Sequence, residues 1–212
     1  MLIDFRTLFP KYNIKPKGVL HIGANVGEEF SVYMDLGIAR QIWIEPNPEL
    51  FVKLSATIAH NPKALACNWC AGDQDKEITL HISNNAGQSS SILDLGTHKQ
   101  AHPEVSYVRD IVTNMHRIDS KFKFMNDDLY NLNNVDFLNI DVQGAELLAL
   151  KGMGIMLNGF KWAYLEVNKE PLYVGCALVG EIDEYLAGFG FKRVETYWVG
   201  NTGWGDALYI KE

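Results

Sequence analysis

Short apolar segments alternate with segments of helical periodicity along most of this chain. The segments that suit β-strands are 18–22, 41–44, 64–70, 77–82, 135–140, 160–167, 191–198 and 207–210. The segments that suit helices are 28–36, 49–59, 145–150 and 177–187. This alternation is typical of an α/β fold built on a mostly parallel sheet. We therefore expect a ligand to bind at the edge where the parallel strands end.

The size and composition of the chain fit one globular domain. Its 212 residues are 47% hydrophobic and 21% charged, which is an ordinary globular composition. We expect a single domain over 1–212, with a helical extension at 1–17 and a lid-like loop at 83–106. That loop is long, polar and rich in Gly, Ser and His, and such a segment in a compact domain is usually functional or disordered.

Charge and cysteine content restrict the partners and the compartment. The 26 acidic residues outnumber the 19 basic ones, and the net charge of −7 disfavours nucleic acid as the main partner. No apolar run approaches the roughly 18 residues that a membrane-spanning helix needs, so we expect no membrane partner. Three cysteines is a low, odd number that indicates a reducing compartment, and we expect the cytoplasm.

Cys67 and Cys70 form a Cys-x-x-Cys pattern, which occurs in zinc sites and in redox pairs. Both fall in the expected strand 64–70, where residues three apart point to opposite faces of the sheet. No second cysteine pair and no histidine pair completes a set of zinc ligands. We therefore interpret the two cysteines as buried apolar residues.

The segment VLHIGANVGEEF, residues 19–30, leads from an expected strand through a glycine turn into a helix. A turn of this kind is where open α/β sheets bind nucleotides. Asn25 and Glu28 stand where a dinucleotide fingerprint needs glycine, and the P-loop pattern is absent. Glu28 and Glu29 would repel a pyrophosphate at this helix start. A cofactor with a cationic centre and no phosphate therefore fits better.

Glu45 ends the second expected strand, 18 residues after Gly27. An acidic residue at this place accepts hydrogen bonds from ribose hydroxyls. A glycine turn and a ribose-binding carboxylate, without phosphate chemistry, describe S-adenosylmethionine. Two alternatives stay open, namely a nucleotide-linked oxidoreductase on a similar fold and a non-catalytic S-adenosylmethionine-binding module.

The chain resembles the FkbM-type S-adenosylmethionine-dependent methyltransferases, and the resemblance extends from residue 18 to residue 211. The block at 139–152 is its most specific part, whereas the glycine turn alone is a weak signal. The matching stretches are HIGANVG (21–27), IEPNP (44–48), AGD (71–73), GQSSSILD (87–94), NIDVQGAELLALKG (139–152) and WGDALYIK (204–211).

The resemblance implies a class I methyltransferase fold, which is a Rossmann-like, doubly wound sheet of seven mostly parallel strands with an antiparallel last strand. It also implies O-methylation of a hydroxyl on a sugar, a polyketide or a related small metabolite. Glu45 would hold the ribose and Asp73 would contact adenine. Many relatives carry aspartate where this chain has His21. The implied cofactor-binding residues are His21, Gly23, Asn25, Gly27, Glu45 and Asp73.

An alcohol is a weak nucleophile, so methyl transfer to it benefits from a positioned base. Asp141 follows the expected strand 135–140, and Glu166 lies at the end of 160–167, so both fall at the ligand-binding edge. We expect these two residues to be catalytic, with Asp141 as base or acceptor-orienting group. Together with Asn168 they form an oxygen-rich trio able to hold Mg²⁺, although no ligand cluster requires a metal.

The acceptor contacts are expected from the lid-like loop and the last hairpin. Ser90 and Ser91 offer hydroxyls, and His98 offers a base near neutral pH. Trp204 and Asp206 are expected at the hairpin tip, where Trp204 suits stacking on a sugar-like face. The sequence identifies neither the acceptor nor the oligomeric state, and a homodimer is among the possibilities.

Overall fold

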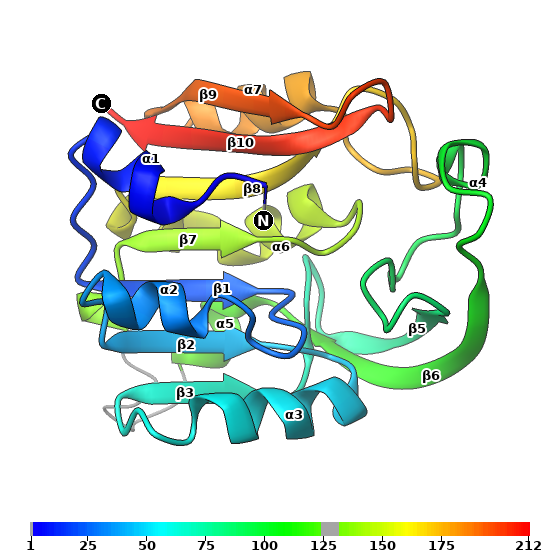
Figure 1. The fold of residues 1–212 in the computed structure, drawn as a ribbon, viewed down its shortest axis with the longest axis horizontal. Helices are drawn as coiled ribbons and strands as arrows, with labels where there is room; N and C mark the ends of the chain where they lie inside the picture. The colour runs from blue at the N-terminus through cyan, green and yellow to red at the C-terminus, as the bar shows by residue number, and fades with distance from the viewer. Residues whose placement is uncertain (1, 124–131) are drawn as a thin grey trace.

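The structure is a computed structural model that describes residues 2–123 and 132–212. Its main sheet is formed by β1 (Gly18–Ile22), β2 (Arg40–Ile44), β3 (Ala64–Cys67), β7 (Phe137–Ile140), β8 (Trp162–Asn168), β9 (Phe191–Trp198) and β10 (Trp204–Lys211). Over the described residues these seven strands have the order β3-β2-β1-β7-β8-β10-β9. β10 runs antiparallel to both of its neighbours, β8 and β9 (Figure 1). The expected mostly parallel α/β sheet with an antiparallel last strand is confirmed.

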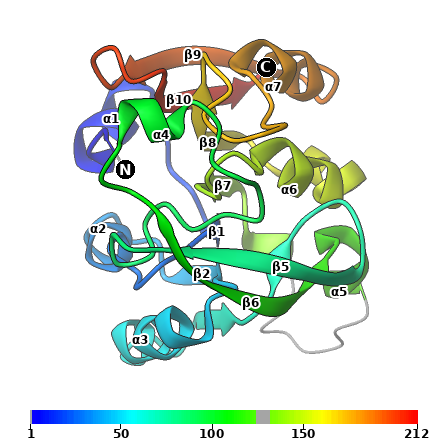
Figure 2. The ribbon, with the colours of Figure 1, turned by 90° about the vertical axis from the view of Figure 1, so that its right-hand side faces the viewer.

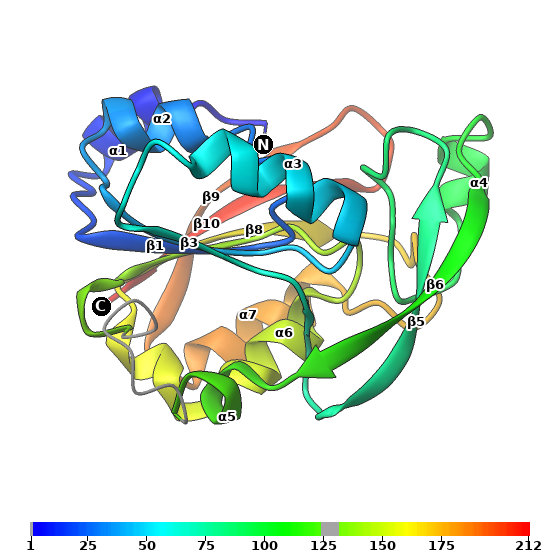
Figure 3. The same ribbon diagram turned by 90° about the horizontal axis from the view of Figure 1, so that it is seen from below.

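Helices cover both faces of this sheet, as Figure 3 shows. On one face lie α1 (Phe5–Lys11), α2 (Phe30–Asp35) and α3 (Pro48–Ile58). On the other lie α5 (Ile118–Lys123), α6 (Glu146–Met153) and α7 (Val179–Ala187). Two 3₁₀ turns, η2 (Leu132–Asn134) and η3 (Gly154–Gly159), complete the connections.

The sequence of α3 explains its position against the sheet. The Asn47 side chain caps the helix by accepting from the Glu49 backbone N–H at 3.0 Å, and Pro48 occupies the first turn. Leu50, Leu54 and Ile58 recur every four residues and are buried. The apolar stripe therefore turns the helix toward the core.

A small second sheet lies beyond the carboxyl ends of the central strands (Figures 1 and 2). It consists of β4 (Cys70–Ala71), β5 (Lys76–Ser83) and β6 (Tyr107–His116), in the order β4-β6-β5. The expected strand 64–70 is therefore wrong in one respect, because the chain leaves the main sheet after β3. Asn68 holds this break, since its amide donates to the backbone carbonyls of Glu45 and Pro46.

The two cysteines of the Cys-x-x-Cys pattern lie in different sheets and are free and buried. Burial raises the pKa of Cys67 to about 11 and that of Cys70 to about 12. Thiols with such pKa values are poor nucleophiles at neutral pH. The arrangement supports their interpretation as packed apolar residues.

The segment 83–106 contains the short helix α4 (His98–Ala101) and is joined to a second segment. Gly96 and His98 donate their backbone N–H groups to the Leu172 carbonyl at 2.7 and 3.1 Å. In the other direction, the Val174 N–H donates to the Asp94 carbonyl at 2.8 Å. The expected loop is thus a structured element that rests on residues 171–174.

The last hairpin also differs from expectation. Trp204 and Asp206 do not lie at its tip, because β10 already begins at Trp204. Trp204 pairs with Asn168, and Asp206 pairs with Glu166, so the antiparallel ladder starts three residues earlier than the apolar pattern of 207–210 indicates. This pairing brings Asp206 beside the end of β8.

The helical extension at the N-terminus is part of the core. Phe5 has no exposed surface and stacks on Phe9, with ring centroids 4.9 Å apart. Its ring also meets the edges of Phe137 and Tyr164 at 5.3 and 4.9 Å. These contacts bind α1 to β7 and β8. Within the described ranges, no helix is long and apolar enough to cross a membrane.

Replacing Phe5 by alanine should lower the free energy of unfolding by about 3–5 kcal/mol, because it leaves a cavity between α1 and the sheet. Chemical denaturation measures the change. Val52→Ala is the matched control, since that side chain is 66% exposed on α3 and should change stability by at most about 0.5 kcal/mol. Equal effects of the two substitutions would show that α1 is not part of the cooperative core.

Candidate active site

A cavity of about 600 Å³ is lined by residues at the carboxyl ends of β1, β2, β7 and β8 and by residues of the segment 83–106. This volume is within the usual range of small-molecule sites. The cavity brings together most of the residues that the sequence singles out. Those that line it are His21, Gly23, Asn25, Glu45, Ser90, Ser91, His98, Asp141, Glu166, Trp204 and Asp206.

The glycine turn after β1 lies against the end of β7. Gly23 has a positive φ of 82°, and a Cβ at this position would overlap the backbone carbonyl oxygen of Asp141. The backbone N–H groups of Gly23 and Ala24 both donate to the Ile44 carbonyl, at 2.9 and 3.1 Å. Glycine is therefore required for the ends of three strands to meet.

Glu45 is held at the end of β2 by two backbone donors. Its Oε2 accepts from the Asn25 N–H and its Oε1 from the Asn47 N–H, each at 2.8 Å. Only 5% of the residue is exposed, and burial raises its pKa to about 7. Each carboxylate oxygen has a second lone pair, so Glu45 can still accept hydrogen bonds from a ligand.

His21 lies in the wall of the cavity as a neutral, packed ring. It stacks on Trp43 with ring centroids 4.8 Å apart, and its Nδ1 lies 3.3 Å from the Tyr33 hydroxyl. Burial lowers the pKa of His21 to about 3. The ring therefore carries no charge at neutral pH, and it offers a polar surface rather than an ionic contact.

Asp141 and Glu166 face each other across one amide. Gln143 Nε2 donates to Asp141 Oδ1 at 2.6 Å and to Glu166 Oε2 at 2.8 Å. Desolvation, followed by the Asp206 charge, raises the pKa of Asp141 to about 6. Burial, followed by the charge of Asp141, raises the pKa of Glu166 well above its ordinary value. The pair therefore favours one negative charge over two near neutral pH.

Glu146 fixes the turn that carries this pair. Its Oε1 accepts from the backbone N–H groups of Val142 and Gly144, each at 3.1 Å. The helix α6 has Ala145 at its N-cap position. The Asp141 carboxylate therefore does not cap α6.

Asp206 of β10 also lines the cavity and is 4% exposed. Its Oδ2 accepts from the Leu2 N–H at 2.7 Å and from the Tyr164 hydroxyl at 2.8 Å. Burial raises the pKa of Asp206. The N-terminal segment and β10 therefore meet at the same carboxylate beside the cavity.

The segment 83–106 contributes Ser90, Ser91 and His98. Ser91 Oγ donates to the Gln143 backbone carbonyl at 2.7 Å, which connects the segment to the turn after β7. His98 is 5% exposed, its Nδ1 has no hydrogen-bond partner among the described residues, and its ring centroid lies 5.4 Å from that of Tyr173. Burial, followed by the neighbouring His102, lowers the pKa of His98.

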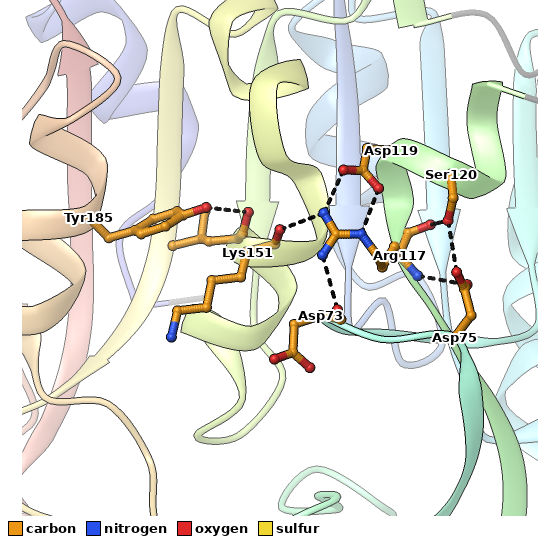
Figure 4. Close-up of polar contacts among 8 residues, drawn as sticks. Asp73, Asp75, Arg117, Asp119, Ser120, Lys151 and Tyr185 are labelled. Atoms are coloured by element: carbon orange, nitrogen blue, oxygen red, sulfur yellow. Dashed lines mark hydrogen bonds and ion pairs between the residues drawn. The ribbon is translucent and has the colours of Figure 1, made fainter.

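Two expected cofactor contacts are not among the residues that line the cavity, namely Gly27 and Asp73. Gly27 lies between β1 and α2, and a Cβ there would be 2.9 Å from the Leu54 side chain of α3. The Asp73 carbonyl accepts from Arg117 Nη1 at 3.0 Å, and Figure 4 shows its carboxylate pointing away from that guanidinium. Arg117 also binds Asp119 and the Lys151 carbonyl, so Asp73 belongs to a cluster between α5 and α6.

Sequence reasoning missed Gln143 and Tyr173 as site residues. The Tyr173 hydroxyl donates to Gln143 Oε1 at 2.6 Å, and both side chains line the cavity. Gln143 lies inside the block 139–152, which is the most specific part of the resemblance to the FkbM family. That block is the sequence signal that could have indicated Gln143. Within residues 2–123 and 132–212, no group of three or more His, Cys, Asp or Glu is arranged to hold a metal ion.

Solved structures show where this fold occurs. A protein of the NADB-Rossmann superfamily from Streptococcus agalactiae is 12% identical, with a TM-score of 0.53, over 100% of this chain and 69% of its own. A candidate methylase, HI0767 from Haemophilus influenzae, is 11% identical, with a TM-score of 0.52, over 97% and 94%. The magnesium protoporphyrin IX methyltransferase ChlM of Synechocystis PCC 6803, solved with bound S-adenosylmethionine, is 10% identical, with a TM-score of 0.51, over 98% and 76%. At these identities the similarity concerns the fold alone.

No curated protein matches the sequence. The family model described as the methyltransferase FkbM domain matches residues 21–193, which is most of the chain and includes the glycine turn, Glu45 and the block 139–152. The chain therefore belongs to the FkbM methyltransferase family, and membership of that family makes S-adenosylmethionine its cofactor.

Proposed function

We propose that the protein transfers a methyl group from S-adenosylmethionine to a hydroxyl of a sugar, a polyketide or a related small metabolite. The observation that carries this proposal is convergence on one cavity. Gly23, Glu45 and Asp141 line it from the main sheet and the turns that follow its strands. Hydroxyl- and imidazole-bearing residues of the segment 83–106 line it as well.

The cofactor side of the cavity fits S-adenosylmethionine by its donors and acceptors. The free lone pairs of Glu45 suit two ribose hydroxyls, which is the role we assign to it. Gly23 and Asn25 would contact the methionyl part, with the neutral His21 ring beside them. Cys70 and Ala71 line the cavity beyond Glu45 and replace Asp73 as the candidates for the adenine contact.

The acceptor side favours an uncharged, hydroxylated molecule. Among the described residues that line the cavity, there is no Lys or Arg side chain. Phosphate and carboxylate groups are usually bound by such cations. Ser90, Ser91, His98 and Asp206 offer hydrogen bonds instead, and Trp204 offers an aromatic face.

In the proposed reaction, the bound cofactor supplies a methyl group on a sulfonium centre. The chain aligns the acceptor oxygen in line with that methyl group and excludes water. As the O–C bond forms and the S–C bond breaks, the hydroxyl proton passes to a carboxylate oxygen of Asp141. Glu166 shares Gln143 with Asp141 and orients it. The two alternatives, oxidoreductase and non-catalytic module, lack a comparable observation in their favour.

Replacing Glu45 by alanine should weaken binding of S-adenosylhomocysteine by about 10–100-fold. The ribose hydroxyls would lose their hydrogen bonds to the Glu45 carboxylate, which are worth about 1.5–3 kcal/mol. Titration calorimetry measures the affinity. Glu49→Ala is the control, since Glu49 is exposed on α3 and pairs with Arg109 at 2.8 Å. An unchanged affinity in Glu45→Ala would remove the ribose assignment.

Replacing Asp141 by asparagine should lower turnover by about 10²–10⁴-fold with little loss of cofactor binding, because the amide cannot take a proton. A screen of hydroxylated metabolites with labelled methyl donor supplies the acceptor for this assay. Wild-type turnover should also fall as pH drops through about 6, because Asp141 becomes protonated there and can no longer take the hydroxyl proton of the acceptor. Near-normal turnover of Asp141→Asn would contradict the base role, and Asp35→Asn on α2 is the surface control.

We also propose that the segment 83–106 is a lid that moves together with residues 171–174. Lys99 is exposed on α4 and gives trypsin a site inside this lid. Trypsin should cut there early in the free protein and later when S-adenosylhomocysteine and an acceptor are present. Cleavage after Lys99 that ligands do not slow would count against a lid.

A further inference from the structure

Gln143 connects the acceptor side of the cavity to the two carboxylates. Its amide nitrogen donates to Asp141 Oδ1 at 2.6 Å and to Glu166 Oε2 at 2.8 Å. Its amide oxygen accepts from the Tyr173 hydroxyl at 2.6 Å, and its backbone carbonyl accepts from Ser91 Oγ at 2.7 Å. One residue thus holds contacts with β8, with the turn after β7 and with both parts of the proposed lid.

These contacts define which way the amide points. An amide has two N–H donors and one acceptor oxygen, and a carboxylate only accepts. Because the two carboxylates only accept, the NH₂ group is directed at them, and the amide oxygen accepts from the Tyr173 hydroxyl. A flipped amide would place its oxygen against two acidic groups and leave the hydroxyl facing an NH₂ group.

The backbone of this turn is built for the same arrangement. Gln143 has a positive φ of 54°, which costs energy for a residue with a Cβ. Gly144 follows with a φ of 95°, and a Cβ there would lie 2.8 Å from the Tyr173 ring. The Ser91 hydroxyl and the Glu146 carboxylate both bind the turn from outside. The surroundings therefore stabilise an otherwise unfavourable conformation.

We propose that Gln143 is a positioning residue for methyl transfer, which aligns Asp141 and Glu166 and ties them to the acceptor lid through Tyr173 and Ser91. This inference rests on the proposed function, because it assigns the proton-accepting step to the same carboxylate pair. The inference adds that displacement of the lid frees the Gln143 amide. Asp141 and Glu166 are then aligned for methyl transfer only when the lid is in place.

The charged groups around Asp141 and Glu166 oppose ionisation of this pair, whereas the Gln143 amide favours it. Glu29, Glu146 and Asp206 all act on Asp141 or Glu166 and oppose their ionisation. No Lys or Arg appears among the described residues that line this cavity. The two amide N–H bonds favour the ionised form of each partner. Without them, both carboxyl groups should hold their protons to higher pH.

Carboxyl ¹³C NMR titration of Asp141 and Glu166 tests this inference without any acceptor. Gln143→Met keeps the side-chain length but removes both donors, and the titration midpoints should rise by about one pH unit or more. Gln74→Met is the matched control, because Gln74 is exposed in the turn before β5 and lies outside both the cavity lining and the proposed lid. Its midpoints should equal those of the wild type.

Turnover provides the second measurement, on whichever acceptor the metabolite screen yields. Gln143→Met should lower kcat by roughly 100-fold, with a smaller change in the KM for S-adenosylmethionine, because the base is misplaced rather than removed. Tyr173→Phe leaves Gln143 in the chain but removes the hydroxyl that directs its amide. It should shift the midpoints in the same direction by less, and it serves as the test if Gln143→Met does not fold.

The possible results separate this inference from the proposed function. Midpoints that are the same in Gln143→Met, Tyr173→Phe and the control overturn the positioning role, whatever the turnover. If no hydroxylated acceptor is methylated, O-methylation fails, while raised midpoints would still support the role of Gln143 in setting the carboxylate pair.

Discussion

The close contact between the turn after β1 and the end of β7 determines the rest of the site. Gly23 lies so near the Asp141 backbone carbonyl that any side chain there would overlap it. The same turn hydrogen-bonds to Ile44 at the end of β2 and to the carboxylate of Glu45. Glu45, which we propose as the ribose ligand, and Asp141, which we propose as the base, are therefore brought to one cavity by backbone packing.

Burial of carboxylates gives this cavity its chemical character. The Glu45, Asp141, Glu166 and Asp206 carboxyl groups all have raised pKa values because the protein desolvates them. An ionised group in such a place interacts strongly with a cationic ligand, since water screens it little. A site of this kind suits a sulfonium cofactor better than a phosphorylated one, which agrees with the absence of glycine at positions 25 and 28.

The sequence predicts those parts of the structure that depend on local pattern. The alternation of strands and helices predicts the sheet. It also predicts that the turn after β1 and Glu45 lie close together, because the carboxyl ends of parallel strands meet at one edge. The break between Cys67 and Cys70 is not predictable in this way, since it depends on a long-range hydrogen bond from Asn68. The position of Asp73 after a strand suggests a site residue, whereas its backbone carbonyl accepts from Arg117 and Asp73 is not among the residues that line the cavity. Tyr173 and Gln143 are 30 residues apart and meet only in the folded chain, so no spacing in the sequence indicates their contact.

Titration calorimetry with S-adenosylhomocysteine and, separately, with NAD tests the central claim most directly, because the two ligands share adenosine but differ in the pyrophosphate. The account predicts that S-adenosylhomocysteine binds and that NAD does not, since Glu28 and Glu29 stand beside the glycine turn and line the cavity. Binding of NAD without binding of S-adenosylhomocysteine would contradict it.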